Sequence, residues 1–255
     1  MTTPTPPIPR DIPDLPAVPG TPVLLHAPVP ATAVVAPARR PAIAVFRLAT
    51  AVLAAVGVAL ELLLGSPDRV LSYFGVQAAI LLTLVSLASA RRAWLAGRPV
   101  PSFLTGAAAL YAVVSALVYH LLLGHTTPPF LMTGPAHPPV TWHPQWVALQ
   151  LLYVAAPAAA VIDWLLLTPP GRLHIRQTAG WMLYPLAYLA FSLTRAELLL
   201  PGTPGRYLYL FLDVQQHGYR GTLANALLLG LSFYALAVLM VTLDHIRPNP
   251  VGRRP

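Results

Sequence analysis

The sequence predicts an all-α, polytopic membrane protein, a bundle of six transmembrane helices with both termini in the cytoplasm. Hydrophobic residues make up 56% of the 255 residues and charged residues only 9%, whereas a soluble domain carries about 25% charged residues. Apolar runs also recur along the chain, each near the roughly 20 residues needed to cross about 30 Å of hydrocarbon. These observations exclude a water-soluble globular protein.

The first 41 residues differ in composition and are predicted to lie outside the membrane. Residues 1–41 contain 12 of the 30 prolines, and no apolar stretch reaches the roughly 7–15 residues of a signal-peptide core. Because proline fixes φ and removes a backbone donor, we expect a disordered or polyproline-like arm. The arm is interpreted either as a solvated tail or as a proline-rich docking ligand.

The transmembrane domain is predicted to cover residues 42–245, followed by a basic cytoplasmic tail at 246–255. Its six spans are evenly apolar, and a helix that crosses the bilayer satisfies all its own backbone groups. The predicted spans are 42–64, 71–90, 103–123, 146–167, 180–200 and 223–243.

The distribution of basic residues predicts the orientation. All 16 basic residues are arginine, and basic residues remain preferentially on the cytoplasmic side. Eleven arginines fall on one side and three on the other, which places both termini in the cytoplasm and predicts a multi-pass protein of the cell membrane. The three on the outer side are Arg69, Arg206 and Arg220.

Polar residues inside the spans gather near their outer ends, where we hypothesise a polar cavity open to the outside. Charges in hydrocarbon are costly, so those that occur usually have a partner or a task. Arg195 and Glu197 lie about 200° apart on a helix, so each needs a separate partner. Glu61 and Asp213 are the candidate partners of Arg195. A salt-bridge network that only fixes the bundle is the alternative. The candidate cavity residues are Gln77, His120, Tyr153, Arg195, Glu197 and Asp213.

The predicted loop 124–145 has no charged residue and contains His125, His137 and His143. With His120 nearby, these side chains raise the possibility of a zinc site, but their spacing is irregular and no carboxylate joins them. A polar loop stiffened by prolines is the favoured interpretation, and no metal is predicted.

The sequence lacks the common catalytic and cofactor motifs. It contains no G-x-S-x-G, no H-E-x-x-H, no phosphate-binding loop, no dinucleotide fingerprint and no cysteine. We therefore predict no cofactor. The net charge of +8 is explained by contact with anionic lipid headgroups, so membrane lipids are the expected partners and nucleic acid is not implied.

Several short segments within residues 46–243 form a distinctive combination. They are 72–79 (SYFGVQAA), 118–123 (VYHLLL), 163–166 (DWLL) after Pro157, 169–173 (PPGRL), 181–188 (WMLYPLAY) and 207–213 (YLYLFLD) with Gly218 and Tyr219. In this order and spacing they resemble the Pr-six-Pr membrane proteins of actinobacteria. That family is similar in turn to the eukaryotic androgen-induced family of six-span membrane proteins, members of which hydrolyse fatty acid esters of hydroxy fatty acids with a threonine nucleophile and a histidine.

The resemblance implies that the reacting residues of that family are replaced in this chain. A threonine, a serine and an asparagine on one face of the second span correspond here to Gly75, Ala78 and Ala79, and the family histidine corresponds to Tyr153. Glycine has no side chain that could act as a nucleophile. Tyrosine, with a pKa near 10, is a poor general base at neutral pH.

We therefore expect a non-catalytic member that binds lipid or serves as a structural or interaction protein. A lipid ester hydrolase that uses Ser72, Thr83 or His120 instead is the first alternative. A small transporter or channel is the second, although no inverted repeat is visible.

Overall fold

The computed structural model describes residues 39–124, 130, 132, 144–200, 203 and 205–248. These residues are helical, without any strand among them, and they belong to one compact unit that begins at Ala38. The all-α class is therefore confirmed. Most of the predicted proline-rich arm (residues 1–38) and the end of the basic tail (249–255) lie outside the described residues.

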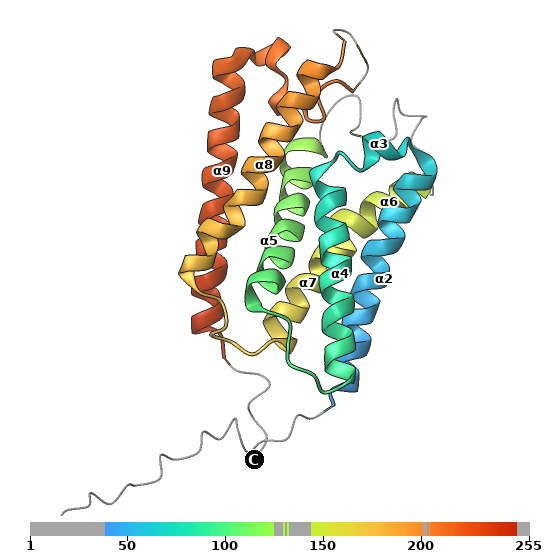
Figure 1. Cartoon of the computed structure of the whole chain (residues 1–255), viewed down its shortest axis with the longest axis vertical. Coiled ribbons are helices and arrows are strands. Elements are labelled where there is room, and N and C mark those ends of the chain that lie inside the picture. Colours follow the sequence, from blue (N-terminus) through green and yellow to red (C-terminus); the bar gives the residue numbers. More distant parts are fainter. Residues whose placement is uncertain are drawn as a thin grey trace, which may run out of the picture. The chain divides into compact units, whose positions relative to one another are not determined.

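The helices follow one another along the chain with short connections (Figure 1). Helices α5, α6 and α7 each continue directly into a π-helical turn. As a result, α5 and η1 form one long rod, and α6, η2, α7 and η3 together form another. In chain order the elements are α2 (Pro41–Leu64), α3 (Pro67–Val70), α4 (Phe74–Trp94), α5 (Ser102–Val118), η1 (Tyr119–Leu123), α6 (Pro144–Gln150), η2 (Leu151–Ala155), α7 (Ala156–Ile162), η3 (Asp163–Leu167), α8 (Ile175–Leu198), η4 (Leu210–Leu212) and α9 (Val214–Ile246).

Five helical rods among the described residues are long and apolar enough to cross a membrane. They are Pro41–Leu64, Phe74–Trp94, Ser102–Leu123, Pro144–Leu167 and Val214–Ile246, and they match five of the six predicted spans. The remaining predicted span, 180–200, lies mostly in the 24-residue helix α8, which is not among the five. Polar residues at both ends of α8, from Arg176 and Gln177 to Arg195 and Glu197, lower its hydropathy.

The arginines collect at one end of the bundle, which we call the arginine-rich end. It contains Arg40, Arg91, Arg92, Arg98, Arg172, Arg176 and Arg247. The backbone N–H of Arg40 donates to the carbonyl of Ala93 (3.1 Å), and that of Gly171 donates to the carbonyl of Asp244 (3.0 Å). These contacts join the beginning of α2 to the end of α4, and the loop before α8 to the end of α9. The beginning of α2 and the end of α9 therefore lie at the same end (Figure 1).

Two prolines within the helices are accommodated in different ways. A proline ring collides with the carbonyl four residues earlier in a regular α-helix and leaves that carbonyl without its usual donor. Before Pro157, the wider π-helical turn η2 provides the additional space. Helix α8 continues through Pro185, and the carbonyl of Trp181, four residues earlier, instead accepts the hydroxyl of Tyr111 at 2.7 Å. Pro185 thereby creates the acceptor that joins α8 to α5.

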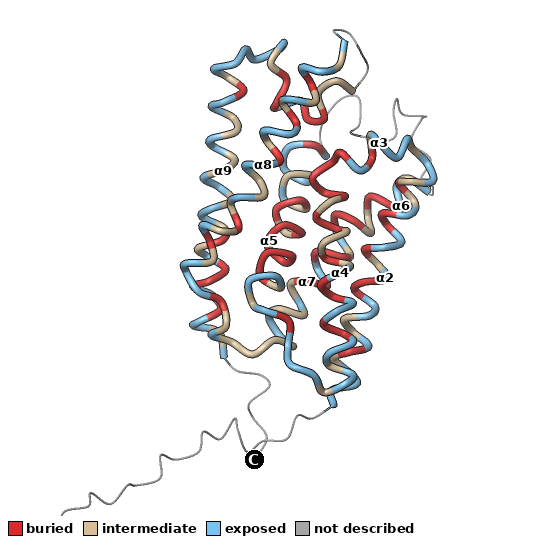
Figure 2. Tube along the Cα trace, viewed as in Figure 1, coloured by how far each residue is buried: buried red, intermediate tan, exposed pale blue. Residues whose placement is uncertain are grey.

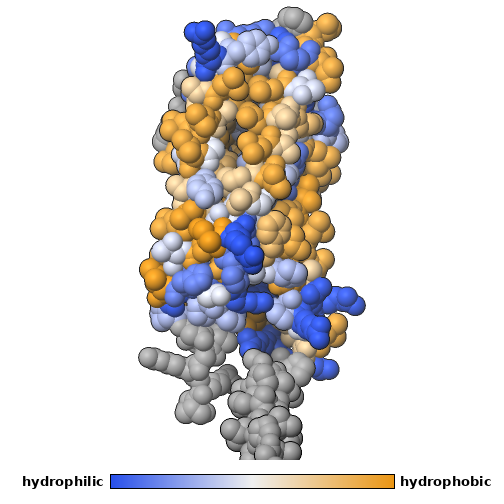
Figure 3. Space-filling view, turned by 60° about the vertical axis from the view of Figure 1, so that its left-hand side comes forward, coloured by the Kyte–Doolittle hydropathy of each residue, from blue (hydrophilic) through white to orange (hydrophobic). Residues whose placement is uncertain are grey.

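Small residues bring the helices into close contact. A Cβ atom on Gly57 would lie 2.9 Å from the Leu152 side chain, and one on Gly106 would lie 2.5 Å from the Trp181 ring. Burial is concentrated on α4 and α5, whereas much of α8 and α9 is exposed (Figure 2). Figure 3 shows that hydrophobic side chains dominate the flank between two more polar ends. This arrangement suits a hydrocarbon environment.

Candidate functional site

A large apolar cavity lies between the α8–α9 hairpin and the elements α4, α5 and η2. Its volume is about 480 Å³, within the roughly 300–1,000 Å³ typical of small-molecule sites. Aromatic side chains from all sides contribute to the wall, namely Phe74, Tyr153, Tyr188, Tyr209, Phe211, Phe233 and Tyr234. The lining residues described by the structure include no histidine and no charged residue. Such a cavity suits an uncharged, apolar ligand.

Gly75 and Tyr153 meet at the wall of this cavity. A Cβ atom built on Gly75 would lie 2.5 Å from the hydroxyl oxygen of Tyr153 and 2.9 Å from its Cε1 atom. Both distances are too short for non-bonded contact, so the Tyr153 ring occupies the space that a side chain at position 75 needs. The two positions that the family resemblance singles out are therefore neighbours, and glycine and tyrosine fit each other there.

Tyr153 is held by an aromatic ring and a thioether. Its ring stacks on Tyr119, with centroids 4.4 Å apart and planes 6° from parallel. Its hydroxyl contacts the sulfur of Met132 at 3.9 Å. Tyr153 lies in the π-helical turn η2 and Tyr119 in η1, and such turns change the direction in which side chains project. Of the stacked pair, Tyr153 lines the cavity, and Tyr119 supports its ring.

Two further tyrosines fix the beginning of α4 beside the cavity. The hydroxyl of Tyr188, on α8, donates to the carbonyl of Ser72 at 2.9 Å. Tyr209 lies in the loop before η4, and its ring packs edge-on against the ring of Tyr73, the residue that precedes α4, with centroids 5.8 Å apart. Burial raises the pKa of Tyr209, and its hydroxyl therefore stays neutral at physiological pH.

The cavity opens toward the flank formed by α8 and α9. Leu223, Leu227 and Leu231 on α9, and Leu186 on α8, line the cavity and are also exposed; Leu227 is 65% exposed. Ala226 and Gly230 lie between these leucines, and a Cβ atom on Gly230 would contact nothing within 4 Å. Small residues on α9 thus leave the hollow unfilled.

The structure does not bring the six candidate polar residues together in one cavity. Only Tyr153 lines the large cavity. Gln77 lies outside it, donating to the Leu71 carbonyl (2.8 Å) and accepting from the Tyr184 hydroxyl. His120 is exposed, with its ring edge against Tyr119.

The remaining three candidates hold the α8–α9 connection in place. Arg195 donates to the carbonyls of Gly205 (3.1 Å) and Arg206 (3.3 Å), rather than pairing with Glu61 or Asp213. Glu197 lies 3.6 Å from Arg206 and accepts from the Tyr219 hydroxyl at 3.1 Å. Asp213 caps α9 by accepting from the backbone N–H groups at positions 215 and 216. These contacts agree better with the alternative interpretation of the sequence, a polar network that only fixes the bundle.

Glu61 has an environment that the sequence did not indicate. Its side chain is fully buried, and neither carboxyl oxygen has a hydrogen-bond partner among the described residues. A buried carboxyl without a partner is costly to ionise in hydrocarbon. Glu61 is therefore not the counterion of Arg195 that the sequence suggested.

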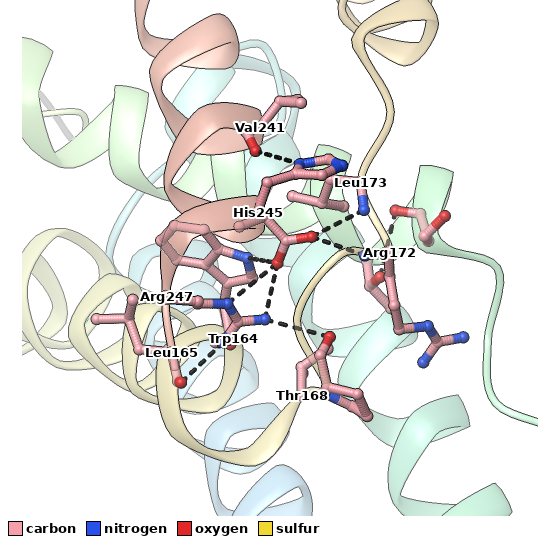
Figure 4. Close-up of polar contacts among 12 residues, drawn as sticks. Trp164, Leu165, Thr168, Arg172, Leu173, Val241, His245 and Arg247 are labelled. Carbon is pink, nitrogen blue, oxygen red and sulfur yellow. Dashed lines mark hydrogen bonds and ion pairs between the residues drawn. The ribbon is translucent and has the colours of Figure 1, made fainter. Parts of the chain in front are cut away.

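Asp244 is a structural anchor that sequence analysis missed (Figure 4). One carboxylate oxygen accepts from the Trp164 indole (3.2 Å) and from Arg247 (2.7 Å). The other accepts from the backbone N–H groups of Arg172 (2.8 Å) and Leu173 (2.9 Å). This carboxylate joins the end of α9 to η3 and to the loop before α8. The sequence did contain one indication of this role, because Asp244 lies three residues before Arg247 at the end of the last apolar run.

The residues suggested for a substitute hydrolase mechanism do not line the cavity. Ser72 donates to the Asp68 carbonyl (2.6 Å) and Thr83 to the Ala79 carbonyl (2.8 Å). Ser115 does line the cavity, but its hydroxyl donates to the Tyr111 carbonyl at 2.7 Å. No activating base adjoins it among the described lining residues, as a serine nucleophile would require.

Within the described part of the chain, no group of three or more histidine, aspartate or glutamate side chains is placed to hold a metal ion. His125, His137 and His143 lie outside the described residues, so the zinc interpretation of that loop is untested. Comparisons with protein-family models, curated proteins and solved structures found no match.

Proposed function

We propose that this protein is a non-catalytic, six-span protein of the cell membrane that holds an acyl chain of a membrane lipid in the cavity beside Gly75 and Tyr153. The single observation that carries the proposal is the cavity of about 480 Å³ with an almost wholly apolar wall. Its exposed leucines on α8 and α9 give an acyl chain a route from the bilayer. Each buried methylene group contributes about 0.8 kcal/mol to such binding.

The six-span topology is part of this proposal. Helix α8 has 24 residues, enough to cross about 30 Å of hydrocarbon at about 1.5 Å per residue. The beginning of α2 and the end of α9 lie together at the arginine-rich end, which we assign to the cytoplasm. Membership of the actinobacterial Pr-six-Pr family belongs to the same proposal and is supported by the segments that carry the resemblance.

The absence of catalysis is proposed from the geometry of the described residues. A hydrolase of the related family would need a nucleophile near position 75 and a base near position 153. Gly75 and Tyr153 supply neither. Two other hydroxyls of the wall are already donated to backbone carbonyls, that of Ser115 to Tyr111 and that of Tyr188 to Ser72.

The experiment fills the cavity and measures bound lipid. Gly230→Phe places a ring in the open space beside α9, whereas Leu239→Phe changes an exposed residue of α9 that does not line the cavity. Native mass spectrometry of the protein extracted in mild detergent is expected to show a retained lipid in the wild type and in Leu239→Phe. Gly230→Phe is expected to lose most of it.

Equal lipid retention in wild type and Gly230→Phe would contradict the proposed site. Hydrolysis of acyl esters that Ser115→Ala abolishes would instead favour the hydrolase alternative.

A further inference from the structure

A second, smaller cavity lies inside the bundle at the arginine-rich end and is separate from the apolar one. It is enclosed by α2, α4, α5, α7, η3, the loop before α8 and the end of α9, and its volume is about 40 Å³. Its wall includes serine and threonine hydroxyls together with Arg47, Asp163, Arg172 and Asp244. None of the residues that line it was a sequence-based site candidate.

Two buried serines face this cavity without a protein partner. Ser86 and Ser89 are 8% and 5% exposed, lie three residues apart on α4, and both line the cavity. The hydroxyls of Thr50, Thr83 and Ser115 donate to the carbonyl four residues earlier. Ser86 and Ser89 make no such bond among the described contacts. Neither hydroxyl oxygen is among the fully inaccessible polar atoms that lack a partner, so both hydroxyls are open to the cavity and can donate to what occupies it.

The carboxylates in the wall are already satisfied. Asp244 accepts four different donors, described above. Asp163 accepts the Arg47 Nε at 2.8 Å and the Thr168 hydroxyl at 3.5 Å. Cations are therefore not favoured, because the oxygens that would bind them already accept donors.

The unused groups are donors. Arg47 donates through Nε to Asp163 and through Nη2 to Thr168, which leaves Nη1 without a partner among the described residues. The guanidinium of Arg172 has no described partner either, and Figure 4 shows its side chain extending away from the contacts of Asp244. Arg47 is balanced by Asp163 and Arg247 by Asp244, whereas Arg172 adds one uncompensated positive charge.

The volume restricts the ligand. A water molecule needs roughly 10–15 Å³ of such space, so about 40 Å³ holds one monatomic anion or a few water molecules and excludes a phospholipid headgroup. An excess of donors and one excess positive charge favour the anion. We propose that this cavity binds one small inorganic anion of the size of chloride, held by the hydroxyls of Ser86 and Ser89 and by Arg47, with Arg172 supplying the charge.

The test measures thermal stability of the purified full chain in sodium chloride and in sodium gluconate at equal ionic strength. A specific site stabilises the folded state in a saturable way as the ion concentration rises. We expect a saturable rise in Tm with chloride that gluconate does not reproduce. The Ser86→Ala/Ser89→Ala variant is expected to lose this chloride-dependent rise, and Ser232→Ala, which removes an exposed hydroxyl on α9, is expected to keep it.

Arg172→Gln tests the same site if the double serine variant does not fold, because the Arg172 side chain makes no hydrogen bond or ion pair among the described residues. This variant too is expected to lose the rise. Anomalous diffraction from crystals grown in sodium bromide locates the ion, and a peak beside Ser86 and Ser89 is expected. A cavity that holds water molecules only, or a chloride response that the serine and arginine variants share with wild type, would overturn the proposal.

Discussion

At the scale of single residues, the contact between Gly75 and Tyr153 determines what can stand at these two positions. The Tyr153 ring fills the space beside Gly75, so a side chain at position 75 is excluded as long as the tyrosine is present. A threonine would fit at position 75 only if the side chain at position 153 were smaller. The residues at the two positions are therefore coupled by one steric contact.

Gly75→Ala is expected to lower the free energy of unfolding by about 1–3 kcal/mol relative to Gly230→Ala, because the new methyl group collides with Tyr153. Both changes share the gain in helix propensity of alanine over glycine, and Gly230 has open space around it. Denaturant unfolding in detergent micelles measures the difference.

A double-mutant cycle with Tyr153→Leu is the control. The penalty of Gly75→Ala should become smaller in the Tyr153→Leu background. An unchanged penalty would mean that the collision with Tyr153 is not its cause.

Sequence reasoning identified both residues of this contact but not the contact itself. Gly75 and Tyr153 were found through their positions in family motifs on two different helices. Their distance depends on how α4 packs against η2, and on the π-helical turn before Pro157, which no local pattern reported. The predicted polar cavity at the outer ends of the spans was not found for a related reason. Arg195 donates to a carbonyl of the loop after α8, and Asp213 caps α9. Hydropathy does not encode either contact.

At the scale of elements, Pro185 and Tyr111 together explain how α8 docks on α5. Pro185 lies within the predicted span 180–200, and a proline inside a helix commonly kinks or ends it. In the structure the helix continues, and the carbonyl that Pro185 leaves free is bonded by Tyr111. The Trp181 ring packs over Gly106 at the same place.

Tyr111→Phe is expected to destabilise the protein by about 1–3 kcal/mol, because it leaves the carbonyl of Trp181 buried without a donor. In the Pro185→Ala background, residue 185 regains an N–H that bonds this carbonyl. The same tyrosine change should therefore cost less there. Tyr234→Phe, at an exposed tyrosine of α9, is the matched control. Equal costs of Tyr111→Phe with and without Pro185 would argue against this explanation.

Five of the six spans were predictable because hydropathy is averaged over many residues. Their predicted ends lie within four residues of the observed ends, except at the N-terminal end of α9, which begins at Val214 instead of position 223. The extra residues include Gly218, whose φ of 66° bends the chain near the start of α9. That left-handed conformation favours glycine, but the residues before it are too polar to extend an apolar run.

At the scale of the whole molecule, the bundle consists of two parts with different packing. α2, α4, α5 and the rod from α6 to η3 share the buried core, whereas the α8–α9 hairpin is more exposed (Figure 2). The hairpin is fixed to the core at the arginine-rich end by the bond of Asp244 with the Trp164 indole of η3 and by that of Tyr111 with the Trp181 carbonyl. Toward the other end, the apolar cavity separates it from the core.

The chain contains no cysteine, so single introduced cysteines report topology without background labelling. We expect a membrane-impermeant maleimide added to intact cells to label Ser66→Cys and Leu200→Cys, but not Gly97→Cys or Arg176→Cys. All four positions are exposed.

Permeabilised cells, in which all four variants should react, provide the control. Labelling of positions 176 and 200 from the same side of the membrane would show that α8 does not cross, and would leave five spans.

The account depends most directly on an acyl chain occupying the apolar cavity. The decisive measurement is photo-crosslinking of the full chain, in bilayer nanodiscs, with a phospholipid that carries a diazirine near the end of one acyl chain, followed by peptide mapping of the labelled residues. The account predicts label on Tyr153, Phe233 and Leu227, and its loss in Gly230→Phe but not in Leu239→Phe. Label confined to exposed residues outside the cavity, such as Val45 and Val52 on α2, and unchanged in Gly230→Phe, would contradict it.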